Sequence, residues 1–560
     1  MDILLDKNEQ LKKVHQLIIQ NKYIIVLILV NFITNYLFIL QYKFYSDDWV
    51  ATVNPFVAPY SYSSLLQSPD RPIYYVILKF QAQIFQDYAL IYHILGFITT
   101  SIILILIYKI AKKLFSDFNY SAEMYPFLAA LIYCVLFNKD EMYPWALVAL
   151  GFYSIMYMVS FYTYINKEKD HYLGYSLIAY TLGLFTYESG IALPVIFFSY
   201  DILLKKDYKK SFLFAIPLVF NLLVRKTAWF GYGTTVSDRS FGDWGFQSLL
   251  HNVFDFVSAS IFMIFRQILY ALQGLQTLGS LIIIITILNL IMLFILYKLI
   301  DFNDVPRTGN IYFGLLLVII TAAFAFPFIL RGGLLSGSLP TRSFEFIDIG
   351  IAFLLTFIVG YLSKPHLKKI LVLIFIGTCI FLCQGLFMNW VVSGDIQEDV
   401  YHFIGEHSNE INSYDYVYFN NPSFVLNKPN AIDESAFYPV AKIYFQYIRN
   451  DPQALEHRIT AQKQKSSGST IDNEYDRYFN AKGLDNYALA DMLSLKVDKF
   501  KNGNYSNYLI YGKANNVPLE VTDEYIIFQS PYPGGQNITV EKSQVYEINY
   551  DKVYPINNPQ

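Results

Sequence analysis

Long apolar runs recur through the chain between Tyr23 and Val392. Most of them approach the ~20 residues that an α-helix needs to cross the hydrocarbon core of a membrane. The chain of 560 residues is 54% hydrophobic and 18% aromatic, which is more apolar than an ordinary soluble domain. The pattern therefore predicts a polytopic α-helical membrane protein.

Charge and cysteine content exclude several other classes of protein. A net charge of -3 offers no basis for binding nucleic acid. Cys134, Cys379 and Cys383 all lie inside apolar runs, so we expect them to be small buried residues and not a disulfide framework or a zinc site. Lysines precede the first apolar run and no small-residue cleavage site follows it, so we expect a cytoplasmic segment 1–22 and a retained anchor.

The positions of the lysines predict the topology of the membrane region, residues 23–392. We expect about eleven transmembrane helices, at residues 23–40, 89–108, 124–137, 144–165, 172–186, 189–204, 211–224, 278–300, 311–330, 344–362 and 370–392. Lysine clusters follow the second, fourth and sixth of these spans, at residues 109–113, 167–169 and 205–210. Cytoplasmic loops carry an excess of lysine and arginine, so this alternation predicts a cytoplasmic N-terminus and an outward-facing first loop, residues 41–88.

Two apolar segments are interpreted differently. Residues 73–87 are interrupted by Lys79 and several glutamines, which favours a helix on the membrane surface. Residues 251–275 carry Asp255 and Arg266, and we interpret them as an outer-face surface or re-entrant helix. Counting 251–275 as a span would reverse the sidedness of everything that follows.

The composition changes at Ser393, where Tyr, Asn, Asp and Lys become frequent and apolar runs become short. Residues 414–420 and 507–511 alternate like strands, whereas 436–449 and 487–495 have helical periodicity. We therefore expect residues 393–560 to form a mixed α/β soluble domain on the outer face.

Asp47 and Asp48 follow the first apolar run directly, and Asp70 and Arg71 come about 22 residues later, before the next apolar segment. A solvated loop would also account for this composition. The predicted topology, however, brings the acidic pair to the same face as Arg71 and Glu188. Further charged residues are expected on that face: Asp140, Glu141, Arg225, Lys226, Asp238, Arg239, Arg331 and Arg342. A carboxylate can act as a general base, and arginines can hold a phosphate bidentately.

The form Ser46-Asp47-Asp48-Trp49, followed by Asp70-Arg71-Pro72, resembles the clan C glycosyltransferases (GT-C). It is most similar to the bacterial serotype-converting O-antigen glucosyltransferases, which read DDW and then GRP. Protein O-mannosyltransferases and lipid A aminoarabinose transferases are more distant relatives that share the first-loop acid. The resemblance covers about residues 23–392, and Asp70 departs from it by replacing the glycine before the arginine.

This resemblance implies an enzyme of the inner (plasma) membrane that transfers a sugar from a polyprenyl-phosphate carrier to a glycan or lipid-linked acceptor. It implies an active site on the periplasmic or extracellular face, with Asp47 or Asp48 as the catalytic base and Arg71 near the donor or the acceptor. Glu188, Arg225, Arg331 and Arg342 are expected to contact the donor. No cofactor is expected, although paired acids suit Mg²⁺ or Mn²⁺, because relatives that use simple lipid monophosphate donors are generally metal-independent.

Two other classes of function fit the composition. A transporter or flippase for lipid-linked sugars would place charges at the membrane midplane on broken helices, often within internal repeats, and the sequence shows neither feature. A non-catalytic membrane assembly protein would explain the apolar runs but not the acidic pair of the first loop.

Overall fold

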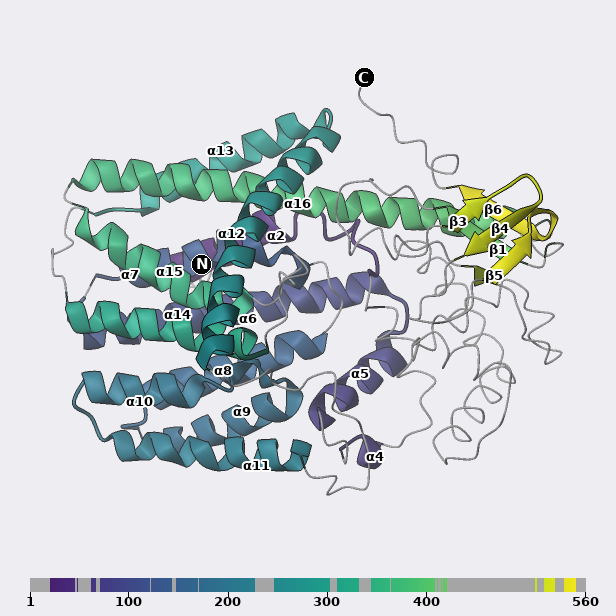
Figure 1. The fold of residues 1–560 in the computed structure, drawn as a ribbon. Coiled ribbons are helices and arrows are strands. Elements are labelled where there is room, and N and C mark those ends of the chain that lie inside the picture. Colours follow the sequence, from purple (N-terminus) through teal and green to yellow (C-terminus); the bar gives the residue numbers. More distant parts are fainter. Residues whose placement is uncertain are drawn as a thin grey trace, which may run out of the picture.

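The computed structural model describes residues 21–45, 48, 62–66, 71–120, 122–143, 148–169, 171–226, 246–302, 310–331, 344–362, 364–407, 410, 414, 416–420, 509–510, 518–528 and 538–549. Most of these residues form a bundle of helices that run side by side (Figure 1). The first half of the bundle contains α2 (Lys22–Asn35), α4 (Tyr62–Leu66), α5 (Pro72–Phe85), α6 (Ala89–Asp117), α7 (Met124–Val135), α8 (Val148–Ile165), α9 (Tyr172–Thr186), α10 (Leu193–Leu203) and α11 (Ala215–Lys226). The second half contains α12 (Phe246–Thr277), α13 (Leu281–Leu299), α14 (Ile311–Arg331), α15 (Phe344–Tyr361) and α16 (Pro365–Glu406). Short 3₁₀ helices occur at η1 (Phe137–Met142), η2 (Glu188–Gly190) and η3 (Tyr208–Phe214).

Six of the described helices are long and apolar enough to cross a membrane: α6, α12, α13, α14, α15 and α16. Five of them coincide with spans expected from the sequence, so the prediction of a polytopic α-helical membrane protein is confirmed at this level. The expected count of eleven is not supported by helix length. The other six expected spans correspond to α2, α7, α8, α9, α10 and α11.

Two of these apolar runs are longer than the helix they contain, because part of the run folds differently. The run 23–40 forms a helix only as far as Asn35, after which the chain turns. The run 211–224 begins inside the 3₁₀ helix η3, and α11 starts at Ala215. A helix of 12 residues such as α7 rises only ~18 Å, compared with the ~30 Å of a hydrocarbon core.

Residues 251–275, expected to form an outer-face surface or re-entrant helix, lie within α12, one unbroken helix of 32 residues, so the re-entrant alternative is not supported. Its length and composition make it a candidate span, yet Figure 1 shows it running across the other helices. Phe254 and Phe265 are exposed on its outer side, at 70% and 65%, whereas Asp255 and Gln267 are buried. The helix is therefore apolar outward and polar inward, as expected for a helix packed on a bundle in lipid.

The composition change at Ser393 falls inside one helix. α16 has 42 residues, so it is ~63 Å long, and Figure 1 shows it projecting beyond the bundle towards the strands. The expected boundary between membrane region and soluble region therefore coincides with no break in the chain's secondary structure.

The described residues after α16 form two three-stranded sheets. In the first sheet, β1 (Tyr416–Asn420) pairs in parallel with both β2 (Leu509–Ile510) and β6 (Val545–Asn549). In the second, β3 (Pro518–Val521), β4 (Tyr525–Phe528) and β5 (Ile538–Glu541) are antiparallel. The strands expected at 414–420 and 507–511 are confirmed, whereas the helices expected at 436–449 and 487–495 lie outside the described residues.

The ends of α6, α8 and α10 meet in a network of ion pairs, which we call the lysine-rich end. Lys167 pairs with the buried Asp201, and Lys206 lies 3.4 Å from Glu168 and 3.9 Å from Asp117. Burial lowers the pKa of Lys167, and the bond to Asp201 partly offsets this effect. The lysine clusters that follow the second, fourth and sixth expected spans thus lie at one end of the bundle.

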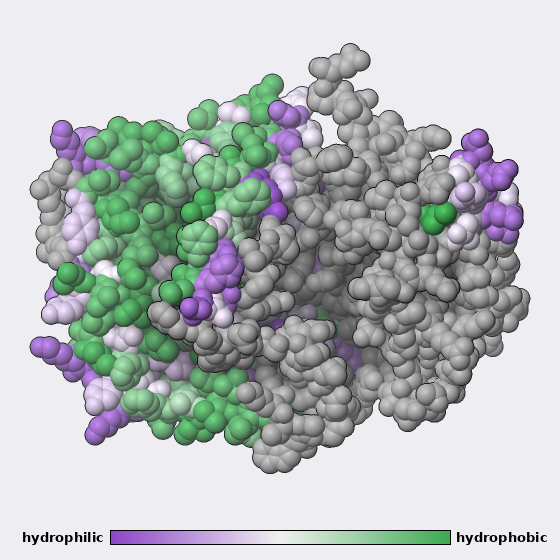
Figure 2. All heavy atoms as spheres, in the orientation of Figure 1, coloured by the Kyte–Doolittle hydropathy of each residue, from purple (hydrophilic) through white to green (hydrophobic). Residues whose placement is uncertain are grey.

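Hydrophobic residues cover much of the bundle between its two ends (Figure 2). Hydrophilic residues gather on the left of that view, where the connections α10–η3 and α15–α16 lie in Figure 1. The three cysteines are buried, as expected. Polar side chains inside the bundle bind one another: Asn31 on α2 donates to Thr100 and Ser101 on α6, and Asn35 donates to the carbonyl of Cys134 on α7.

Two glycines allow α12 and α16 to touch. A Cβ on Gly385 would lie 2.1 Å from the carbonyl oxygen of Ala271, and one on Gly274 would lie 1.8 Å from the carbonyl oxygen of Gly385. Small residues at crossings let membrane helices approach closely. The backbones of α12 and α16 are therefore in direct contact at this crossing.

We predict that Gly385→Ala destabilises the protein by about 1–3 kcal/mol, because the new methyl group forces the two helices apart. Gly174→Ala is the matched control, since a Cβ there meets nothing within 4 Å and alanine favours a helix by ~1 kcal/mol over glycine. Thermal unfolding of the purified protein in detergent measures both effects. Equal midpoints for the two variants would contradict the predicted contact.

Candidate active site at the end opposite the lysines

The loop that leads from α2 to Asp48 is attached to α6 and α16. His93 Nε2 on α6 donates to the carbonyl of Lys43 at 3.0 Å. The Tyr45 ring packs edge-on against Trp390 of α16, with centroids 5.0 Å apart. A Cβ on Gly394 would lie 2.7 Å from Cγ of Lys43, so α16 can approach the loop this closely only with glycine at that position.

Asp48 takes part in the turn at the end of this loop. The backbone N–H of Tyr45 donates to Asp48 Oδ2 at 3.0 Å, and the N–H of Asp48 donates to the Tyr45 carbonyl at 2.8 Å. A side chain that reaches back three residues to a backbone N–H forms half of a capping box. The carboxylate is 1% exposed, so it is fixed and enclosed.

The Tyr45 hydroxyl is influenced by a second carboxylate besides that of Asp48. Burial raises the pKa of the Tyr45 hydroxyl far above its usual range, and the negative charges of Asp395 and Asp48 raise it further. Asp395 lies on α16 directly after Gly394, where a Cβ would lie 3.1 Å from the Tyr45 hydroxyl oxygen. The loop therefore brings together acids that are far apart in the sequence.

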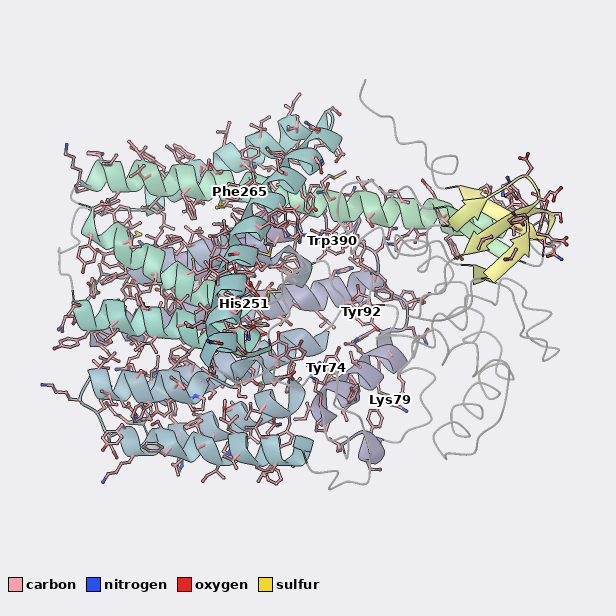
Figure 3. All side chains as sticks on the ribbon, in the orientation of Figure 1. Tyr74, Lys79, Tyr92, His251, Phe265 and Trp390 are labelled. Carbon is pink, nitrogen blue, oxygen red and sulfur yellow. The ribbon has the colours of Figure 1, made fainter. Side chains whose placement is uncertain are left out.

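Tyr92 on α6 joins this loop to α5. Its ring packs edge-on against Phe44 of the loop and Phe85 of α5, with centroids 5.1 and 5.6 Å away. Its hydroxyl donates to the carbonyls of Gln81 and Gln86 at 3.1 and 3.0 Å. Figure 3 shows Tyr92 and Trp390 at the same end of the bundle. The helix expected at 73–87 is confirmed as α5. Tyr92 contacts both Phe44, near the start of the first loop, and α5, near the end of that loop.

Arg71 is the residue directly before α5, and it forms a bidentate ion pair with Glu188. Arg71 Nε donates to Glu188 Oε2 at 2.9 Å, and Nη2 donates to Oε1 at 2.6 Å. The guanidinium also lies 3.9 Å from the centre of the Tyr187 ring. Arg71 is almost completely buried, whereas the Glu188 side chain is 30% exposed. Such a bidentate, stacked arrangement is specific to arginine.

A second charged cluster lies buried between η1 and α15. Lys139 Nζ donates to the carbonyl of Leu136 at 2.9 Å and lies 3.4 Å from Asp348 Oδ2. Asn138 donates to Asp348 Oδ1 at 2.8 Å. Lys139 and Asp348 are both 0% exposed. A charge in such a place is stable only with its partner.

No protein-family model matches the chain, and no curated protein matches it. The function therefore has to be inferred from the residues and their geometry.

The expectation that Arg71 and Glu188 lie at one end of the bundle is confirmed, because they form an ion pair. Asp48 is attached at the same end, but α5, ~20 Å long, runs between its anchor at Tyr92 and Arg71. Arg225 lies in the last turn of α11 and Arg331 ends α14, while their side chains lie outside the described part. Asp47, Arg342, Asp238 and Arg239 also lie outside the described residues.

The sequence did not indicate Asp395, Lys139, Asp348 and Glu345 as site candidates. Asp395, Glu398 and Asp399 are spaced i, i+3 and i+4 on α16, and that spacing could have indicated an acidic helix face. The expected spans contain few charges, but Glu345 and Asp348 lie in the first two turns of α15. Within the described part of the chain, no three His, Cys, Asp or Glu side chains are placed to hold a metal ion.

We predict that Lys139→Met destabilises the protein by about 3–5 kcal/mol, because it leaves the Asp348 carboxylate buried without its counter-charge. The double variant Lys139→Met, Asp348→Asn should recover much of that loss, since no buried charge then remains in the pair. Midpoints of thermal unfolding for the single and double variants measure the difference. A double variant that loses the sum of the two single effects would refute the pairing.

Proposed function

We propose that the protein is an integral-membrane glycosyltransferase that moves a sugar from a polyprenyl-phosphate carrier to a surface glycan, such as an O-antigen. The observation that carries this proposal is the anchoring of the first loop at Lys43 and Tyr45, directly before the acidic pair. Contacts from His93 and Trp390 tie that loop to two candidate membrane-spanning helices, at the end of the bundle opposite the lysines. Carboxylates held at the boundary of a membrane bundle suit chemistry on a lipid-borne substrate.

The reaction requires a base and a cationic partner for phosphate. One acid of the first loop, Asp47 or Asp48, removes the proton from the acceptor hydroxyl as the bond to the sugar forms. The lipid phosphate leaves with the electron pair of the broken bond, so no other energy source is needed. The bond from the Tyr45 N–H orients Asp48.

Arg71 is the arginine best supported as a contact for the donor phosphate, because Glu188 and Tyr187 hold its guanidinium in one orientation. Arg225, Arg331 and Arg342 are proposed as further donor contacts. Arg225 and Arg331 end helices that run towards the same end of the bundle as α5 in Figure 1. Glu188 is assigned to Arg71 and not to the sugar.

The finer topology is part of the same proposal. The proposal keeps the eleven expected spans, shorter helices included, with α12 lying across them; the positive-inside rule then assigns the lysine-rich end to the cytoplasm. The first loop and the C-terminal strands then face the periplasm or the cell exterior, and the protein belongs to the inner (plasma) membrane. The parallel pairing of β1 with β2 and β6 requires crossover connections, commonly helical, and this supports a mixed α/β C-terminal domain.

A flippase for lipid-linked sugars is the second candidate, because Lys139 and Asp348 are buried in the bundle beside the 3₁₀ break η1. Transporters use buried charges at broken helices. Asp348 lies near the start of α15 and away from its middle, however, and Lys139 is already neutralised by it. The glycosyltransferase proposal therefore has stronger support than the flippase proposal.

We predict that Asp47→Asn or Asp48→Asn lowers sugar transfer by about 10²–10⁴-fold, the usual contribution of a general base. Transfer is measured in membrane vesicles with a radiolabelled polyprenyl-phosphate sugar and acceptor glycan. Host surface glycan with and without the protein is compared in parallel to identify the product. If both variants fold normally and keep full transfer, the first-loop acid is not the base.

Glu123→Gln is the matched control for these variants. It makes the same change of carboxylate to amide, but on an exposed residue that pairs with Lys112, remote from the first loop. Its transfer rate should equal that of the natural protein. Translocation of the lipid-linked sugar across vesicles, with no transfer by any form, would instead identify a flippase.

A further inference from the structure

Arg71, Tyr187 and Tyr153 form a three-layer stack. The Arg71 guanidinium lies 3.9 Å from the Tyr187 ring centre. The Tyr153 ring of α8 is stacked on the Tyr187 ring, with centroids 4.9 Å apart and planes within 19°. The Arg71 guanidinium carbon lies over the Tyr187 ring, and the Tyr153 ring is stacked on the same ring. Both groups cannot occupy one face at these distances, so Tyr187 lies between Arg71 and Tyr153.

The inner end of this stack is bonded to a buried acid. The Tyr153 hydroxyl donates to Glu345 Oε2 at 2.9 Å. Glu345 lies in the first turn of α15 and is 4% exposed. This hydrogen bond fixes the position of the Tyr153 ring, because its hydroxyl is bound to Glu345 of α15 and its Cα belongs to α8.

The backbone of Tyr187 is held as well. The Tyr157 hydroxyl donates to the Tyr187 carbonyl. Gly183 and Gly190 flank that position, and a Cβ on either would lie 2.6 or 2.3 Å from the Tyr157 ring. The chain can pass Tyr157 this closely only with glycine on both sides, so Tyr187 has little room to move.

We infer that Tyr153 and Glu345 are positioning residues for Arg71, and that they hold its guanidinium in place through the Tyr187 ring. The bonds from Nε and Nη2 to Glu188 set the orientation of the guanidinium, and the Tyr187 ring limits its position from one side. Together these contacts orient the remaining N–H donors of Arg71. The contacts themselves do not depend on the proposed function. Their purpose, which is to present Arg71 to a lipid-phosphate donor, rests on it.

A double-mutant cycle tests the coupling without any assay of function. Tyr153→Phe keeps the ring and removes the hydrogen bond to Glu345. Glu188→Gln weakens the bidentate ion pair with Arg71. Thermal unfolding midpoints of the full-length protein in detergent are measured for both single variants and the double variant. We expect the double variant to lose clearly less than the sum of the single losses, since contacting residues in one network are not additive.

Tyr125→Phe is the control partner for this cycle. Tyr125 on α7 is also a buried tyrosine, but its hydroxyl has no hydrogen-bond partner among the described residues. Combined with Glu188→Gln, it should give additive losses. Additive losses for Tyr153→Phe as well would overturn the positioning role, whether or not the protein transfers sugar.

Transfer kinetics then test the purpose of the stack. In Tyr153→Phe we expect the KM for the polyprenyl-phosphate sugar to rise about tenfold with little change in kcat, the result of losing binding shared by ground state and transition state. Glu345→Gln keeps an oxygen that can accept from Tyr153 and should retain a KM within about threefold of the natural value, whereas Glu345→Leu should behave as Tyr153→Phe does. A kcat that falls with KM unchanged in Tyr153→Phe would refute the role. Absence of transfer by the natural protein would refute the proposed function and leave the unfolding cycle to decide the coupling.

Discussion

Polar groups within a bundle surrounded by lipid must find their partners inside the protein, because no water is there to replace them. This requirement explains where the described helices meet. Asn31 and Asn35 join α2 to α6 and α7, and Gln384 on α16 binds Asn289 on α13. The same requirement acts at both ends of the bundle, where Asp201 is matched by Lys167 and Arg71 by Glu188. Polar pairing thus contributes, beside apolar packing, to which helices are neighbours.

Sequence patterns predicted the features that depend on local composition. The apolar runs predicted the helices, and the spacing of lysines correctly separated the two ends of the bundle, so that Arg71 and Glu188, 117 residues apart, were expected at the same end. The strand β1 was also predicted from its alternation. Each of these inferences uses a rule that operates within a short window or counts charges between helices.

Features that depend on distant contacts were not predicted. The buried pair Lys139–Asp348 joins residues 209 positions apart, and Lys139 looks in the sequence like an ordinary loop lysine beside Asp140. The involvement of Asp48 in the turn with Tyr45 needs backbone geometry that a pattern of residue types does not contain. The close crossing of α12 with α16 depends on Gly274 and Gly385, which lie 111 residues apart in the sequence.

The length of α16 has a consequence for where the C-terminal strands can lie. A 42-residue helix rises ~63 Å, about twice the ~30 Å of a hydrocarbon core. If one half of α16 crosses the membrane, the other half extends about as far beyond it, so the strands that follow lie away from the lipid surface. The distance between these strands and the membrane-embedded helices is therefore set by one continuous helix.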